Sequence, residues 1–261
     1  MKRPLLDVAF ASDKRKSVLL LLQDGPKKMK IVLDSLDTTR QALLPQMRIL
    51  EDYHLVTGSN DVYKLTTIGE IIVNEMIPLL DTISVFDSDI HYWGTRKLNF
   101  IPHYLLERIN ELGKCRIVNP PIPEIYSIHT QFHETTKISE SVFVITTFLY
   151  PNYSTLLSDL IENDIQMHII ISNDLYCKIQ NHQYPDFEEL IDNKLFHLFV
   201  CPDKMDFLAF AYNDHQTLLT LLTNREEFDN KFVICSDPSA IEWAKELFEH
   251  YLKDSVPITE L

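Results

Sequence analysis

The sequence is poor in glycine, and this shortage excludes several classes of binding site. Only 5 of the 261 residues are glycine, and neither GxGxxG nor GxxxxGK[ST] occurs. A glycine-rich loop that cradles a phosphate group is therefore not expected. The chain also lacks a GxSxG nucleophile elbow and an HExxH zinc motif. We expect no cofactor, no metal and no catalytic residues, and we predict that the chain is not an enzyme.

Closely spaced cysteines are absent as well. The four cysteines, at positions 115, 177, 201 and 235, include no CxxC pair. This spacing indicates neither a zinc site nor a disulfide framework. We expect buried thiols, because free cysteine is among the residue types most often found in protein cores. Redox sensing is an alternative that the spacing leaves open.

Long hydrophobic runs are missing too. No apolar stretch approaches the roughly 18 to 20 residues that a membrane-spanning helix needs. The start of the chain, MKRPLLDVAF, lacks the apolar segment and the cleavage site of a signal peptide. We therefore expect a cytoplasmic protein without a membrane partner.

Charge is divided unevenly along the chain. The formal net charge is -14, which argues against a nucleic-acid partner, because basic side chains supply most nonspecific affinity for phosphate. Residues 1–64, however, contain 11 basic and 8 acidic side chains, whereas the rest contains 13 basic and 30 acidic ones. The first part is thus the one suited to nucleic acid.

The first 65 residues show the pattern of three helices followed by a β-hairpin. Ser12 is a suitable cap for the first helix, and the sequence DGP ends it. The expected helices are 12–23, 27–36 and one that starts near 38, and the expected strands are 54–56 and 62–65, around the turn TGSND.

The third helix contains a proline at position 45. Thr38 and Gln41 have the spacing of a capping box at its start. Its buried face is expected to be formed by Leu43, Met47 and Leu50. Pro45 falls on the opposite face, where the carbonyl that it leaves unbonded can turn to water. A bend without a function, or two short helices that meet at Pro45, are alternatives.

The stretch LDTTRQALLPQMRILEDYHLV resembles the recognition helix of archaeal and bacterial winged helix-turn-helix regulators of the ArsR-like type. In that pattern a Ser/Thr-Arg start leads to L..LE..GLV, and His54 stands here in place of the glycine. YKLTTIGEII similarly resembles the Y.LT..G segment that closes the wing. The resemblance implies an α+β DNA-binding domain whose third helix enters the major groove of double-stranded DNA.

Within that resemblance, particular side chains are suited to DNA. Arg40 and Gln41 are the expected readers of base edges, because arginine matches guanine and glutamine matches adenine. Leu44 is suited to a thymine methyl group. The complete set of predicted DNA-binding residues is Thr39, Arg40, Gln41, Leu44, Arg48 and Lys64, with further phosphate contacts from Lys14, Arg15, Lys16, Lys27, Lys28 and Lys30.

Residues 66–93 are predicted to be helical and are unusually apolar for an exposed helix. Pro78 is expected to divide them into two helical segments. We expect this stretch to form a homodimer interface, because winged helices usually read paired half-sites as two-fold dimers. Packing against the chain's own domains is the alternative.

From about residue 95 strand-like and helix-like runs alternate, which predicts a mixed α/β domain. FDSDIHYWGTRKLNFIPHYLLERINELG and FVICSDPSAIEWAKELFEHYL resemble the middle, effector domain of FilR-type methanogenesis regulators from archaea. The order of elements from SVFVITTF onward also resembles half of a phospholipase D-type domain. That family's catalytic HxKx4D is degenerate here, because Ile170 stands two residues after His168.

Ligand candidates in this part follow strand-like runs. Thr147, Ser172 and Asn213 are placed at the carboxyl ends of strands, where open α/β sheets bind small molecules. Capping of helices and strand ends by these polar residues is the alternative reading. His129 and His133 have the spacing of two zinc ligands on a helix but no evident third ligand.

Taken together, these features predict a winged helix-turn-helix domain at 1–77, a helical linker for dimerisation at 78–112 and an α/β effector domain at 113–261. The predicted function is a dimeric DNA-binding transcriptional regulator whose C-terminal domain senses an unknown small molecule or partner. An enzyme built on the α/β domain, or an interaction module whose winged helix does not bind DNA, are the alternatives.

Overall fold

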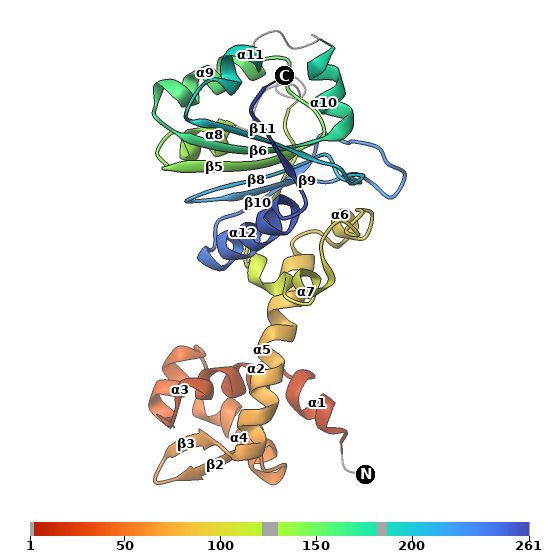
Figure 1. The fold of residues 1–261 in the computed structure, drawn as a ribbon. Helices are drawn as coiled ribbons and strands as arrows, with labels where there is room; N and C mark the ends of the chain where they lie inside the picture. The colour runs from red at the N-terminus through yellow and green to blue at the C-terminus, as the bar shows by residue number, and fades with distance from the viewer. Residues whose placement is uncertain (1–2, 122–129, 182–186, 261) are drawn as a thin grey trace. The chain divides into compact units, whose positions relative to one another are not determined.

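The computed structural model describes residues 3–121, 130–181 and 187–260. Contacts divide the chain into two compact units, Met1–Leu80 and Asp81–Leu261 (Figure 1). The first unit is mainly helical with a small sheet, and the second contains a large sheet covered by helices. This agrees with the predicted mixed α/β class. The finer division at residues 77 and 112 stays a prediction.

The first unit combines helices with a three-stranded antiparallel sheet of order β1-β3-β2. Its core contains side chains from every helix and from the hairpin. The helix at Leu5–Phe10 was not expected from the sequence, whereas the helix that Ser12 caps was. The elements are α1 (Leu5–Phe10), α2 (Asp13–Leu21), η1 (Leu22–Asp24), β1 (Lys27–Lys28), α3 (Met29–Ser35), α4 (Arg40–Asp52), β2 (Val56–Ser59) and β3 (Val62–Leu65).

Helix α4 keeps its predicted buried face. Leu43, Met47 and Leu50 are fully buried, whereas Pro45 is exposed and the helix runs through it unbroken. The predicted capping box is wrong in its position. The hydroxyl of Thr39, and not that of Thr38, caps the helix by accepting a hydrogen bond from the backbone N–H of Ala42.

The β2–β3 hairpin turns through two residues with positive φ. Asn60 and Asp61 have φ values of 51° and 63°, which suit the two central positions of a type I′ turn. His54 lies just before the hairpin with φ 57°, the left-handed conformation expected where the family pattern has glycine.

The start of the next helix explains the segment YKLTTIGEII. The Thr66 hydroxyl donates to the carbonyl oxygen of His54 and accepts from the N–H of Gly69. A Cβ atom at position 69 would lie 2.0 Å from the carbonyl oxygen of Leu55. Only glycine fits there, so this residue allows the helix to pack directly on the turn before the hairpin.

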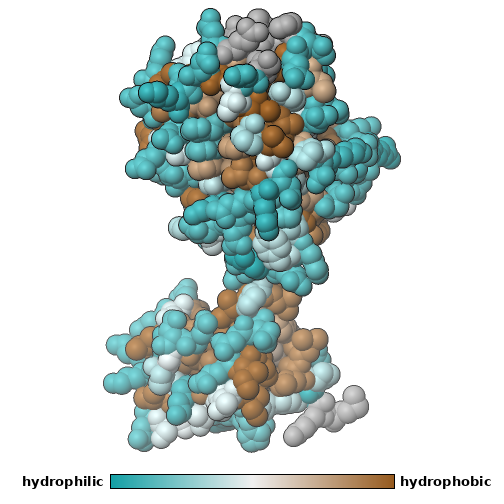
Figure 2. Space-filling view, viewed as in Figure 1, coloured by the Kyte–Doolittle hydropathy of each residue, from teal (hydrophilic) through white to brown (hydrophobic). Residues whose placement is uncertain are grey.

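Helix α5 (Thr67–Asp87) is one element that contains Pro78. The predicted division at this proline is therefore wrong. Four of its large apolar residues are exposed by 45% or more, namely Ile68, Ile71, Leu79 and Ile83. Figure 2 shows hydrophobic atoms, in brown, along the stretch where Figure 1 draws α5.

The second unit is organised around an eight-stranded mixed sheet of order β11-β7-β6-β5-β8-β9-β10-β4. Strands β5, β6 and β7 are parallel to one another, and the other pairs are antiparallel. The strands are β4 (Cys115–Val118), β5 (Ser141–Thr146), β6 (Gln166–Ser172), β7 (Phe196–Cys201), β8 (Ala209–Asn213), β9 (Thr217–Thr220), β10 (Phe232–Cys235) and β11 (Val256–Ile258). The strand-like run SVFVITTF contains β5, whereas β11 was not expected from the sequence.

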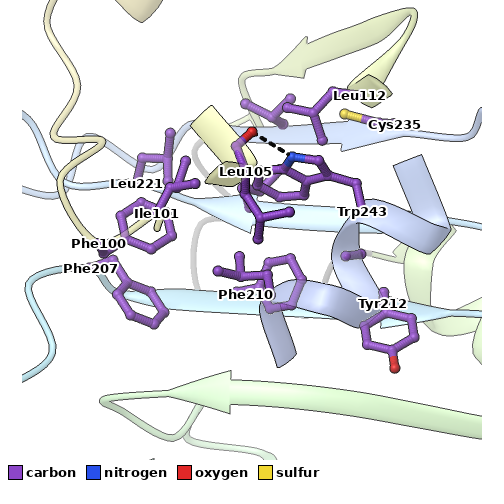
Figure 3. Packing of buried hydrophobic residues seen from close by; sticks show 14 of the residues in the cluster. Phe100, Ile101, Leu105, Leu112, Phe207, Phe210, Tyr212, Leu221, Cys235 and Trp243 are labelled. Carbon is purple, nitrogen blue, oxygen red and sulfur yellow. Dashed lines mark hydrogen bonds between the residues drawn. The ribbon is translucent and has the colours of Figure 1, made fainter. Parts of the chain in front are cut away.

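Helices cover both faces of this sheet (Figure 1). Figure 3 shows the core on the α12 face, where the Trp243 indole N–H donates to the carbonyl oxygen of Leu105 at 2.9 Å. Residues of α9, α10 and α11 pack on the other face. The helices are α6 (Ile90–Trp93), α7 (His103–Leu106), η2 (Ile109–Leu112), α8 (Thr130–Thr136), α9 (Tyr153–Glu162), α10 (Asn173–Gln180), α11 (Phe187–Ile191) and α12 (Pro238–Leu252).

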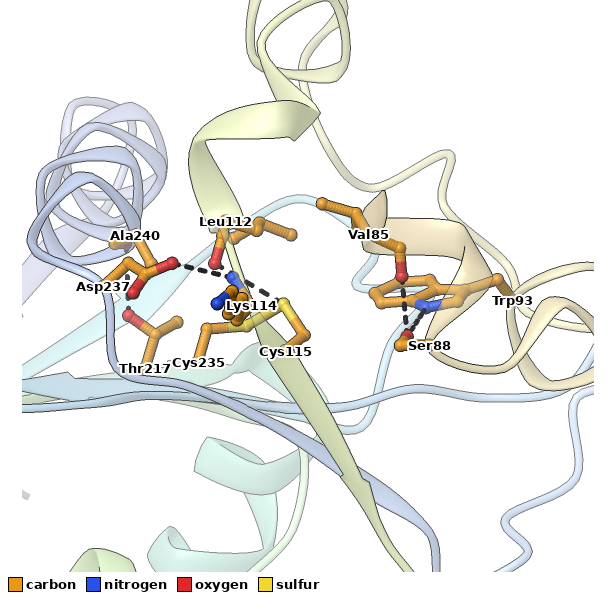
Figure 4. Close-up of a disulfide and its surroundings, with 10 residues drawn as sticks. All are labelled: Val85, Ser88, Trp93, Leu112, Lys114, Cys115, Thr217, Cys235, Asp237 and Ala240. Carbon is orange, nitrogen blue, oxygen red and sulfur yellow. Dashed lines mark hydrogen bonds between the residues drawn. A yellow bond between two sulfur atoms is a disulfide. The ribbon is translucent and has the colours of Figure 1, made fainter. Parts of the chain in front are cut away.

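A disulfide joins two neighbouring strands, which corrects the expectation of four buried thiols. Cys115 and Cys235 are directly opposite in the β4–β10 ladder and are bonded to each other. Figure 4 shows the bond beside Asp237, whose carboxylate accepts from the Lys114 backbone N–H at 2.7 Å. Of the other two cysteines, Cys201 is buried and Cys177 is exposed.

Candidate nucleic-acid interface

Four of the predicted DNA-binding residues lie on one face of α4. Arg40, Leu44 and Arg48 follow one another at intervals of four residues, and Gln41 lies beside them. Arg40, Gln41 and Arg48 are exposed and Leu44 is half-buried. Because the opposite face is buried in the core, the helix presents the polar side chains of Arg40, Gln41 and Arg48 to solvent over about two turns.

Arg40 is already paired, which the sequence did not indicate. Its two terminal nitrogens lie 2.6 Å and 3.4 Å from the two carboxylate oxygens of Asp61. Both side chains are about half exposed. The hydrogen bond to Asp61 raises the pKa of Arg40 above its ordinary value. The base-reading candidate and the tip of the hairpin thus form a two-pronged ion pair.

Lys64 lies on the outer side of the hairpin. It stands opposite Thr57 in the β2–β3 ladder, and its side chain is exposed. The next residue, Leu65, points to the other side of the strand and is buried in the core. Lys64 is therefore placed on a surface that is free for a phosphate contact.

Arg15 is not available to phosphate, which corrects the prediction for this residue. It is only 5% exposed. Its guanidinium donates to the carbonyl oxygens of Val8 and Asp7, at 2.6 Å and 3.0 Å, and to the side-chain oxygen of Gln46 at 2.7 Å. Arg15 therefore joins α1 and α4 to α2.

Two of the other lysines predicted to contact phosphate form salt bridges within the chain. The Nζ atom of Lys16 lies 3.2 Å from Oδ1 of Asp13, and that of Lys27 lies 3.7 Å from Oδ2 of Asp24. Within the part of the chain that the structure describes, no salt bridge of 4.0 Å or less involves the remaining exposed lysines, which are Lys14, Lys28, Lys30 and Lys64.

The three ligand candidates of the second unit make hydrogen bonds within the chain. Ser172 caps α10 by accepting from the N–H of Leu175, and Thr147 donates to the carbonyl oxygen of Leu208. Asn213 is 1% exposed and donates to the hydroxyl of Thr136 in α8. A role for these residues in ligand binding stays a prediction.

Of the two histidines with zinc-ligand spacing, His129 lies outside the described residues. The Nε2 atom of His133 lies 2.7 Å from Oδ2 of Asp159, and the Nζ atom of Lys137 lies 2.9 Å from the same oxygen. The ion pair with Lys137, followed by the hydrogen bond from His133, lowers the pKa of Asp159. Among the described residues no group of three or more His, Cys, Asp or Glu side chains is arranged to hold a metal.

His168, which occupies the first position of the degenerate HxK motif, lies in an aromatic stack. Its ring centroid is 4.7 Å from that of Phe143 and 4.7 Å from that of His197. Burial, and to a smaller extent the charge of His197, lowers the pKa of His168. Ile170 points to the same face of β6 and is fully buried. These contacts are those of core residues.

Two protein families match most of the sequence. Residues 5–84 match the N-terminal domain of the methanogenesis regulatory protein FilR1, and residues 125–254 match the middle domain of the same protein. A curated relative, the methanogenesis regulatory protein FilR1 of Methanothrix harundinacea (strain 6Ac), is 22% identical over 259 residues. These matches support a regulator family for this chain.

The relative is longer than this chain. The match covers 96% of this chain but only 57% of the relative. The chain therefore spans little more than half the length of the curated relative that it matches.

Solved structures give weaker likenesses. TrmBL2, described as an archaeal chromatin protein, aligns with a TM-score of 0.42, 13% identity and 97% coverage of both chains. Phosphatidylserine synthase from Haemophilus influenzae Rd KW20 aligns with a TM-score of 0.35 and 14% identity, over 46% of this chain and 34% of that chain. TM-scores this low do not establish a common fold. Among the described helices, none is both long and apolar enough to cross a membrane.

Proposed function

We propose that this chain is a transcriptional regulator that binds double-stranded DNA through the first unit, as a winged helix-turn-helix of ArsR-like type. In this proposal α4 enters the major groove and the β2–β3 hairpin is the wing. The observation that carries the proposal is the set of exposed side chains Arg40, Gln41 and Arg48, with the half-buried Leu44 between them, on a helix whose other face is buried.

The charge distribution supports the same assignment. The acidic excess of the chain lies after residue 64, and the first part carries more basic than acidic side chains. Lys14, Lys28, Lys30 and Lys64 are exposed on the first unit and are suited to phosphate oxygens. The similarity to a protein named as regulatory is a further support.

The pairing of Arg40 with Asp61 refines the proposal. Arg40 has to leave this carboxylate before it can make a two-pronged bond to guanine. At a nonspecific site no base contact offsets the broken ion pair, and the Asp61 carboxylate competes with phosphate for Arg40. Asp61 therefore favours specific over nonspecific complexes.

We further propose that the protein acts as a homodimer through α5. The exposed Ile68, Ile71, Leu79 and Ile83 fall within one side of this helix when successive residues are placed 100° apart. A row of apolar side chains of this kind is typical of a surface that another helix covers. A chain that stays monomeric at micromolar concentration in light scattering would contradict this part of the proposal.

The test of DNA binding compares the DNA just upstream of the protein's own gene with random DNA at several salt concentrations. Arg40→Ala should weaken specific binding by roughly 5- to 150-fold, because a two-pronged base contact is lost. It should also reduce the discrimination between bases at one position of the DNA site. Lys64→Ala should weaken both complexes and reduce the slope of log K against log salt by about 1, because one phosphate contact is lost.

Lys253→Ala is the matched control, since Lys253 is an exposed lysine of the second unit. It should change neither the affinity nor the salt slope. Equal loss of specificity in Arg40→Ala and Lys253→Ala, or no salt dependence in the unmodified protein, would contradict the proposed interface.

The second unit is proposed to sense a small molecule or a partner that adjusts DNA binding. Its mixed sheet, covered by helices on both faces, is an architecture that often holds ligands. The match to the middle domain of a regulatory protein supports this role.

A further inference from the structure

The second unit contains an apolar cavity of about 160 Å³. Its floor is the sheet face that α8 and α9 cover, and its walls come from these two helices and from the segment after β5. None of the sequence-based predictions concerned this cavity.

The cavity exists because strand β8 carries small side chains on this face. Ala209 and Ala211 point to the cavity, while Phe210 and Tyr212 point to the opposite core. Larger side chains flank the two alanines, since Val144 stands opposite Ala211 on the β5 side. The two alanines thus leave a depression in the middle of the sheet that the helices above do not fill.

One polar group in this lining has no hydrogen-bond partner among the described residues. The hydroxyl of Thr220 is fully buried and makes no hydrogen bond to any residue that the structure describes. Thr220 stands opposite Ala209 in the β8–β9 ladder, and Ala209 stands opposite Thr146 of β5. The Thr146 hydroxyl differs, because it donates to the carbonyl oxygen of Phe148 and accepts from its N–H.

A buried hydroxyl without a partner costs free energy, so its presence needs an explanation. A buried water usually makes about three hydrogen bonds, and the side chains of Ala209, Ala211 and Leu218 around this position offer none. A ligand is different, since it can fill the apolar space and direct a single polar group at Thr220.

We propose that this cavity is the binding site of a small, largely apolar, uncharged molecule that carries one hydrogen-bonding group, which the Thr220 hydroxyl recognises. The volume suits such a ligand, because an engineered apolar cavity of about 150 Å³ in another protein binds benzene. The site itself does not depend on DNA binding. Only the assignment of its ligand as the effector rests on the proposed function.

Hydrogen bonds next to the cavity hold one of its walls in place. Asn213, one of the predicted ligand residues, donates to the Thr136 hydroxyl and holds α8 against the sheet. Thr136 and His133 of α8 both line the cavity. Asn213 is therefore a positioning residue for one wall of the site.

The experiment uses the whole chain and two probes of nearly the same shape, benzyl alcohol and ethylbenzene, which differ by a hydroxyl in place of a methyl group. Calorimetric titration should show both binding to the unmodified protein, with Kd values in roughly the submillimolar to millimolar range. Thr220→Val keeps the shape and removes the hydroxyl. It should weaken benzyl alcohol relative to ethylbenzene by roughly 3- to 10-fold.

Thr217→Val is the matched control on the same strand. Thr217 is also fully buried, but it points to the opposite face and its hydroxyl donates to the carbonyl oxygen of Ala240. The relative affinity for the two probes should not change in this variant. A preference that shifts equally in Thr217→Val and Thr220→Val would overturn the role of Thr220.

Ala211→Leu tests the cavity as the location, because the added side chain fills the depression. It should abolish binding of both probes, and circular dichroism establishes whether the variant is folded. Failure of either probe to bind the unmodified protein, or unchanged binding in folded Ala211→Leu, would overturn the proposal. Because no DNA is present, these results are independent of the proposed regulatory function.

Discussion

The Arg15→Ala substitution provides the sharpest test of how the first unit is built. Arg15 is buried and makes three hydrogen bonds, to the carbonyl oxygens of Val8 and Asp7 and to the side chain of Gln46. A hydrogen bond from a charged group contributes about 1.5 to 3 kcal/mol to stability. Not all three contributions are lost in full, however.

The loss differs from one acceptor to the next. The carbonyl oxygen of Asp7 keeps the bond that it accepts from the N–H of Ala11, and the partly exposed Gln46 can turn to water. Val8 is fully buried, so its carbonyl oxygen has no such access to water. We therefore expect Arg15→Ala to destabilise the first unit by roughly 2 to 4 kcal/mol.

Hydrogen exchange followed by mass spectrometry is the suitable assay, because it reports each unit separately. Both tryptophans, Trp93 and Trp243, lie in the second unit, so their fluorescence does not report on the first. Peptides from α1, α2 and α4 should exchange faster in Arg15→Ala, and those of the second unit should not change. Lys14→Ala is the control, since Lys14 is exposed, and it should leave exchange unchanged. Unchanged protection of α1 in Arg15→Ala would refute the structural role of this arginine.

Three further predictions concern single contacts. Asp61→Asn should strengthen nonspecific DNA binding more than specific binding, and this difference should disappear when Arg40 is also replaced by alanine, as measured in a double-mutant cycle of DNA affinities. Gly69→Ala should destabilise the first unit by roughly 2 to 4 kcal/mol in denaturant unfolding, although alanine is normally the better helix former, because the Cβ atom would meet the carbonyl oxygen of Leu55. The pKa of His168 is lowered by burial, so the unfolded chain takes up a proton more readily and stability should fall as the pH drops below about 6.5. His168→Phe should reduce this pH dependence in urea titrations between roughly pH 7.5 and 5.5, and an unchanged slope would contradict the assignment.

The part of the fold that depends on local sequence was predictable. The buried side of α4 follows from the spacing of Leu43, Met47 and Leu50, and the exposure of Pro45 follows from the same helical period. The exact cap was not predictable in this way. Two adjacent threonines at positions 38 and 39 can each accept a hydrogen bond from a helix N–H, and only the packed helix decides between them.

Features that join distant segments could not be read from the sequence. Cys115 and Cys235 are separated by 120 positions, and their bond requires the order of strands in the sheet. The cavity has the same origin, because its floor joins β5 to β8, and these two neighbouring strands are separated in the chain by β6 and β7. Alternating Ala209 and Ala211 in a strand of otherwise large residues was the available signal for a depression, but it does not show what lies above.

The basic residues of the first unit illustrate the same limit for the candidate site. Lys14 and Arg15 are neighbours in the sequence and carry the same charge, yet one faces solvent and the other is buried by α1, a helix that the sequence pattern did not predict. A count of charges therefore identifies the unit suited to DNA without identifying which side chains are free to contact it.

The Arg40–Asp61 pair was missed for a different reason, since both residues have a sufficient local explanation. Asp61 suits the positive φ that the hairpin turn requires, and Arg40 suits the exposed first turn of α4. Asparagine would tolerate the same φ at position 61 without the negative charge. The turn therefore does not require the carboxylate, and the contact between the carboxylate and Arg40 gives this charge a role. In the proposed complex that role is to make the release of Arg40 depend on the base that it meets.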